Sequence, residues 1–155
     1  MSLLEKIEND FKKVLQKGEA DELGVLRMLK SSLKNKEIEM RVKKQELNDE
    51  VVLEIIRQEI KKRREAVDMF EKGNRQELAK KEEKEILILN QYLPPELSEE
   101  TIKQIIQKAI KEVGALGPGD LGKVMGKAMA EIKGQADGNK IRAMVQESLQ
   151  NKIVI

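Results

Sequence analysis

A glycine-rich segment near the C-terminal end sets the pattern of this chain. It reads LGPGDLGKVMG over residues 116–126 and IKGQADG over residues 132–138, and an apolar helical pattern then continues to Leu149. A glycine inside a helix costs about 0.5–1 kcal/mol relative to alanine. Gly122 and Gly126 lie four residues apart, with Ala130 one turn further, so the three share one helical face. This face predicts that another backbone comes close, from a neighbouring helix or from a ligand.

The composition predicts an all-α protein. Of the 155 residues, 39% are hydrophobic, 37% are charged and only 2% are aromatic, so Leu, Ile, Val and Met must fill the core. The apolar residues recur at helical spacing, and the pattern of a strand is absent before the last few residues. We expect an N-terminal helical domain over residues 1–92, which contains a long antiparallel hairpin, and a C-terminal three-helix domain over residues 96–155.

The composition also excludes several chemistries. The chain has no cysteine and no histidine, which removes disulfides, thiolates, the usual general base and the commonest zinc ligands. It contains no Gly-x4-Gly-Lys-Ser/Thr phosphate loop. A solvated helix surface explains Ser31 and Ser32 better than a catalytic serine–lysine pair. We therefore predict no catalytic residue, no metal site and no cofactor.

No segment has the features of a membrane span or a secretion signal. The apolar runs fall short of the roughly 18–20 residues that a membrane span needs. The N-terminus, Ser2-Leu3-Leu4-Glu5, lacks the basic and long apolar regions of a signal peptide. We expect a soluble, cytoplasmic protein.

Caps and breakers divide the N-terminal domain into four helices. A capping box of Ser2 and Glu5 begins the first helix, and Gly18 ends it. The basic run 61–65 interrupts the apolar stripe of the third helix. It is expected to face the acidic stretch of Glu82, Glu83 and Glu85 across the hairpin, in ion pairs that are weak where exposed.

The second helix is expected from about Asp21 to Met40, with Ile38 in its apolar stripe, and a loop follows at residues 41–44. Asn48 or Asp49 can cap the third helix, which ends near Gly73-Asn74. The fourth is expected over residues 75–92, with Leu78 among its apolar positions.

Pro94-Pro95 marks the domain boundary, because proline disfavours helical geometry in the residue before it and cannot donate to a helix. In the C-terminal domain Ser98 caps the fifth helix, Pro118 suits the first turn of the sixth, and Asp137 caps the seventh.

Two interpretations of the glycine-rich segment, residues 116–138, remain open. In the structural one, Gly134 and Gly138 end or begin helices, and Gly122 and Gly126 let helices cross closely. In the functional one, bare backbone, cations and the N-termini of the sixth and seventh helices bind the phosphates of an RNA. The residues that would do so are Lys123, Lys127, Lys133, Lys140, Arg142, Gly122, Gly126, Gly134 and Gly138.

Several motifs together resemble the GatB/YqeY family, in the order and over the length of a stand-alone YqeY-like protein. They are LRMLK at residues 26–30, QYLP at 91–94 followed by Leu97-Ser98, DLGKVMG at 120–126 and KGQADG at 133–138. The resemblance implies kinship with the helical tail domain of the glutamyl-tRNA amidotransferase B subunit, which helps to hold tRNA while the chemistry takes place elsewhere. Stand-alone members are often labelled carbon–nitrogen ligases that use glutamine as amido-N-donor.

The residues of this chain do not fit that label, because nothing in the sequence forms an ATP-phosphorylation site, holds magnesium or generates ammonia. The resulting hypothesis is a non-catalytic helper that binds tRNA or acts beside an amidotransferase or another translation protein. The alternative is a protein–protein interaction scaffold that does not bind RNA.

Overall fold

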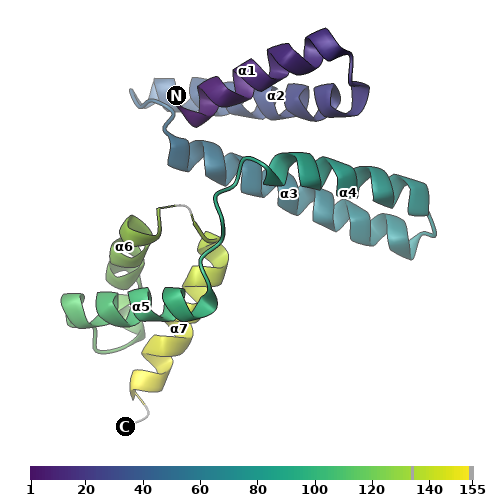
Figure 1. Ribbon diagram of the computed structural model, residues 1–155. Coiled ribbons are helices and arrows are strands. Elements are labelled where there is room, and N and C mark those ends of the chain that lie inside the picture. Colours follow the sequence, from purple (N-terminus) through teal and green to yellow (C-terminus); the bar gives the residue numbers. More distant parts are fainter. Residues whose placement is uncertain (134, 154–155) are drawn as a thin grey trace. The chain divides into compact units, whose positions relative to one another are not determined.

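The computed structural model describes residues 1–133 and 135–153, and within these ranges every regular element is helical, which confirms the all-α prediction. The chain divides into two compact units, Met1–Leu93 and Pro94–Ile155 (Figure 1). None of the described helices combines the length and the apolar character that crossing a membrane would require.

The first unit packs two helical hairpins on each other. Helix α1 spans Leu3–Lys17 and α2 spans Ala20–Val42; α3 spans Asp49–Lys72 and α4 spans Gln76–Asn90 (Figure 1). The predicted capping box forms, with Ser2 Oγ accepting from the Glu5 N–H at 3.1 Å, and Gly18 ends α1 in the left-handed conformation. The core of the first unit consists almost entirely of aliphatic side chains, and each contributes roughly 1.5–3 kcal/mol to stability when fully buried. The largest of them are Ile7, Leu26, Leu29, Leu33, Ile56 and Leu89.

Three details of the first unit differ from the sequence prediction. The loop predicted at residues 41–44 was placed too early, because α2 continues through Val42. Leu78 is exposed, and the smaller Ala79 is buried in its place. Ile38 belongs to the predicted apolar stripe of α2, yet half of its surface is exposed.

Arg63 does not interrupt the stripe of α3 but completes it. Its side chain is buried, and the guanidinium donates to Glu59 Oε2 at 2.9 Å and to Glu85 Oε2 at 3.2 Å. Ser32 of α2 donates to the other oxygen of Glu59 at 2.9 Å. An ion pair across the hairpin was predicted, but this one is buried, and it joins α2, α3 and α4.

The pKa values of Glu59 and Glu82 shift in opposite directions. Burial alone would raise the pKa of Glu59, but the hydrogen bonds from Arg63 and Ser32 outweigh it and lower the pKa. The pKa of Glu82 is raised by burial, by the charge of Glu85 and by a hydrogen bond with Glu85. The three acidic residues that were expected to face the basic run therefore differ, since Glu85 pairs with Arg63, Glu82 is repelled by Glu85 and Glu83 is exposed.

The second unit is a three-helix domain. Helix α5 spans Glu99–Val113, a 3-10 turn at Pro118–Asp120 leads into α6 at Leu121–Ile132, and α7 spans Gly138–Ile153 (Figure 1). Helix α6 packs against α5, and the Leu97 N–H donates to the Gln135 carbonyl at 3.0 Å where the loop after α6 returns to the start of α5. The core of this unit contains no aromatic side chain. It is built around Ile102, Ile106, Ile110, Val124, Ile132, Ile141, Val145 and Leu149.

Replacement of Arg63 by methionine tests the buried ion pair. Arg63→Met keeps the volume but leaves the Glu59 and Glu85 carboxylates without their shared cation, and we expect the free energy of unfolding to fall by about 3–5 kcal/mol in urea denaturation. Lys62→Met is the matched control, because Lys62 also pairs with Glu59 but has a side chain that is 72% exposed. Equal losses in the two variants would contradict the assignment.

Replacement of Glu82 by glutamine tests the repulsion between the two acids. A folded-state pKa above the ordinary value of 4.5 means that Glu82 contributes stability below that value and loses it as the pH rises through the folded-state pKa. Glu82→Gln should therefore raise the Tm at pH 7, and its advantage should shrink in thermal melts below about pH 4.5. Glu83→Gln, at an exposed neighbour, is the control, and a lower Tm for Glu82→Gln at pH 7 would refute the repulsion.

Candidate functional site

The glycines of α6 lie on its solvent face and not at a helix crossing. Gly122, Gly126 and Ala130 are exposed. A Cβ atom built on Gly122 or on Gly126 meets no other group within 4 Å. The structural interpretation of these two glycines was therefore wrong. Ala109 and Ala128, both buried, are the small residues at the core of the α5–α6 packing. The helical spacing of Gly122, Gly126 and Ala130 does not by itself tell whether they face a neighbouring helix or solvent.

An aspartate lies directly before each of the two helix starts that the sequence suggested for phosphates. Asp120, directly before α6, accepts a hydrogen bond from the Leu116 N–H at 2.9 Å. Asp137 caps α7 as predicted and accepts from the Asn139 N–H at 3.1 Å. A bound anion would compete with these side chains for the positive end of each helix dipole. The exposed side of α6 is therefore the better place for a phosphate than either helix start.

The candidate cations do not gather at one place on the surface but form two groups. Lys127 Nζ lies 3.6 Å from Glu112 at the C-terminal end of α5, whereas Lys140 Nζ lies 3.4 Å from Glu99 at its N-terminal end. At 1.5 Å per residue these two glutamates are roughly 20 Å apart along the helix. A single phosphate group therefore does not bridge Lys127 and Lys140.

Helical geometry shows on which side of its helix each of the remaining cations lies. Lys123 lies one turn before Lys127, so both project from the same exposed side of α6. Lys133 follows the end of α6, near the return to the start of α5, and is exposed. Arg142 is exposed but only two positions from Lys140, so it points to a different side of α7.

Two glycines of the predicted site remain. Gly138 begins α7, and a Cβ atom there would make only an ordinary contact with Met129, at 3.9 Å. Gly134 lies outside the described residues. The candidate site is therefore the α6 face, which we define as Gly122, Lys123, Gly126, Lys127 and Ala130.

The α6 face offers two ammonium groups beside backbone that no large side chain covers. Lys127 shares Glu112 with Lys108, which lies 3.9 Å from Glu112 and 3.7 Å from Glu131. All four of these side chains are more than two-fifths exposed, so each pair is worth little and can be exchanged for another anion. The chemistry of the face suits contacts to phosphate oxygens.

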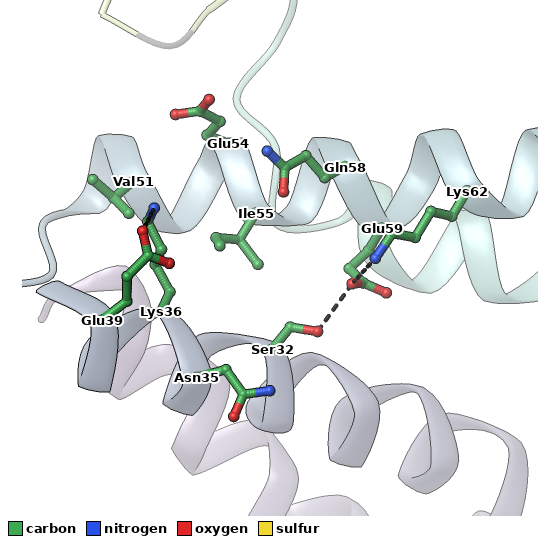
Figure 2. A pocket seen from close by; sticks show the side chains of 10 residues that line it. All are labelled: Ser32, Asn35, Lys36, Glu39, Val51, Glu54, Ile55, Gln58, Glu59 and Lys62. Atoms are coloured by element: carbon green, nitrogen blue, oxygen red, sulfur yellow. Dashed lines mark hydrogen bonds and ion pairs between the residues drawn. The ribbon is translucent and has the colours of Figure 1, made fainter.

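A polar groove between α2 and α3 escaped the sequence analysis. Its volume is about 300 Å³, and it is lined by side chains from both helices, among them Ser32, Asn35, Gln58 and Glu59 (Figure 2). Ser32 donates to the Glu59 carboxylate at 2.9 Å, an arrangement that the serine–lysine alternative did not foresee. The sequence contained one sign of this groove, because Glu59 occupies a position on α3 where the helical spacing places a core residue. Among the described residues no group of acidic side chains is arranged to hold a metal ion.

Comparison with known proteins identifies the family. The family model described as Yqey-like protein matches residues 4–149 of this chain. A glutamyl-tRNA(Gln) amidotransferase subunit from Thermococcus gammatolerans is 35% identical over 69 residues, which is 44% of this chain but 10% of that protein. The chain thus spans about a tenth of the length of the amidotransferase subunits that it matches.

Two fungal relatives are covered over most of their length. An uncharacterized protein from Schizosaccharomyces pombe is 36% identical over 87 residues, which is 56% of this chain and 71% of that protein. The protein named altered inheritance of mitochondria protein 41, mitochondrial, from Pyrenophora tritici-repentis is 24% identical over 148 residues, which is 94% of this chain and 80% of that protein.

A glycine-to-alanine change tests whether the α6 face is kept bare at a cost in stability. Gly126 is in the interior of α6 with open space beside it, so Gly126→Ala should raise the free energy of unfolding by about 0.5–1 kcal/mol. Urea denaturation measures the change. Gly114→Ala is the contrasting variant, because Gly114 has a φ of +65° and alanine is strained there. A loss of stability in Gly126→Ala would mean that this glycine has a structural role.

Proposed function

Because this chain belongs to the Yqey-like protein family, we propose that it is a non-catalytic helper that binds tRNA or acts beside a tRNA amidotransferase. The observation that carries the proposal is the α6 face, where exposed lysines border small residues. The similarity to a glutamyl-tRNA(Gln) amidotransferase subunit supports the choice of tRNA among the possible polyanions. The proposed place of action is the cytoplasm.

The α6 face supports contact with an RNA backbone. Lys123 and Lys127 project from one side of α6, where each can approach a phosphate, and the glycines beside them let that phosphate come close to the helix. Lys127 is held by the exposed Glu112, and a phosphate can replace this carboxylate at little cost. Such contacts are electrostatic and weaken steeply with salt, because binding releases counterions from the RNA.

The residues of the chain support a binding role rather than a catalytic one. With neither histidine nor cysteine in the sequence, the usual activators and nucleophiles of group transfer are missing. Asp120 accepts from the backbone N–H of Leu116, which precedes α6, and Asp137 accepts from the Asn139 N–H in the first turn of α7. The proposal therefore assigns the chemistry of amidation to other proteins.

A salt-dependent tRNA gel shift tests this function. The double variant Lys123→Glu, Lys127→Glu should bind total tRNA at least tenfold more weakly at low salt, and the slope of log affinity against log salt should fall by about 2. Lys12→Glu, Lys13→Glu in α1 is the matched control, because these lysines are exposed and belong to the other unit. If the wild-type protein fails to bind tRNA at low salt, RNA binding is refuted.

A further inference from the structure

The outward face of α2 presents an exposed row of residues with the spacing of a coiled-coil seam. Successive members alternate steps of four and three residues, as positions a and d of a heptad do. Three of them are large apolar side chains with exposed fractions of 57%, 51% and 83%, namely Met28, Ile38 and Val42. The row, which we call the α2 seam, consists of Gly24, Met28, Ser31, Asn35, Ile38 and Val42, and all six are exposed. Two members lie at its edge toward α3, where Met28 Sδ accepts from Arg63 at 3.8 Å and Asn35 lines the polar groove.

Three cations border the α2 seam on one side. Arg27, Lys34 and Arg41 follow one another at intervals of seven residues, so they take position g in successive heptads, and all are exposed. Neither the seam nor this border contains a carboxylate. Lys34 and Arg41 both reach Glu37, at 4.0 and 2.9 Å, but these are surface pairs within one helix and are weak. The cations can therefore turn to carboxylates on another helix.

We propose that the α2 seam binds an α-helix of a partner protein whose own apolar seam is bordered by glutamate or aspartate. Residues at e and g set partner choice in coiled coils through ion pairs between helices, so a basic border selects an acidic one. From Gly24 to Val42 the seam is about 27 Å long, which accommodates between two and three heptads of a partner. Asn35 lies at a position a, where a single asparagine fixes the register of paired helices.

The observations disfavour two other occupants. In a pair formed with a second copy, Gly24, Ser31 and Asn35 would fill half of each seam with small or polar groups, and in an antiparallel pair the cations would face one another. An RNA would satisfy the cations but would leave Ile38 and Val42 without an apolar partner. The opposite face of α2 is occupied by the core of the first unit, so only the outward seam is available.

Binding of a designed helical peptide tests the proposal. The probe is a 24-residue peptide with leucine at a and d and glutamate at e and g, and its control has lysine at e and g. In NMR titrations of the ¹⁵N-labelled full chain, the acidic peptide should shift signals along residues 24–42, and the basic peptide should bind at least tenfold more weakly. Equal binding of the two peptides, or shifts confined to other helices, would overturn the proposal.

Charge exchange distinguishes recognition from nonspecific attraction. The triple variant Arg27→Glu, Lys34→Glu, Arg41→Glu should lose the acidic peptide and gain the basic one, while Lys12→Glu, Lys13→Glu should keep the wild-type preference. Ile38→Asp, Val42→Asp should reduce binding of the acidic peptide at least tenfold without changing the Tm by more than a few degrees, because both side chains are exposed. Unchanged binding in this variant would refute the role of the seam.

A photocrosslinking amino acid in place of Asn35 identifies the occupant in living cells. An acidic, heptad-patterned segment of another protein is the expected product. A second copy of the chain or an RNA as the main cross-linked species would overturn the proposal.

Discussion

A single buried guanidinium fixes how the helices of the first unit face one another. Arg63 lies between carboxylates of α3 and α4, and Ser32 of α2 completes the coordination of Glu59. Removing an ion from water costs several kcal/mol, and its partners offset that cost only when the geometry is good. A rotation of α3 or a slip of α4 by one turn would separate the charges, so this network selects one register among several that aliphatic packing alone would allow. The outward direction of the α2 seam follows from the same choice, because Ser32 fixes which side of α2 faces α3.

Most of the fold was predictable from the sequence, because helix caps and helical spacing are local properties. The Ser2–Glu5 capping box, Gly18 and Ser98 are all found where the pattern placed them. The burial of Arg63 was not predictable from the sequence, for a physical reason. A run of four cations looks uniformly solvated, yet only the member four residues from Glu59 continues the buried face, and its burial depends on Glu85 from another helix. A short stretch of sequence does not reveal which residues of two different helices will pair.

The candidate site was less predictable, because neighbours in sequence diverge on helices. Lys127 and Lys140 are close along the chain, but in the folded unit they reach opposite ends of α5, at Glu112 and Glu99. The glycines of α6 were correctly singled out as unusual, yet their spacing is the same whether they face a helix or solvent. The open space beside Gly122 and Gly126 decides that question, and only the folded chain contains this information.

The two exposed surfaces differ in the physics of the partner that each suits. The α6 face combines lysines with the smallest residues and presents no large apolar group, and residues 94–155 contain no Phe, Tyr, Trp or His. Without aromatic side chains on which bases could stack, an RNA bound there would be held by its phosphates, with little dependence on base sequence. The α2 seam sets arginines and a lysine beside exposed Ile38 and Val42, which gain free energy only when another apolar surface covers them. Phosphates cannot provide such a surface, whereas an amphipathic helix can. The distribution of apolar side chains among the cations, rather than the number of cations, therefore decides whether each surface suits a nucleic acid or a protein helix.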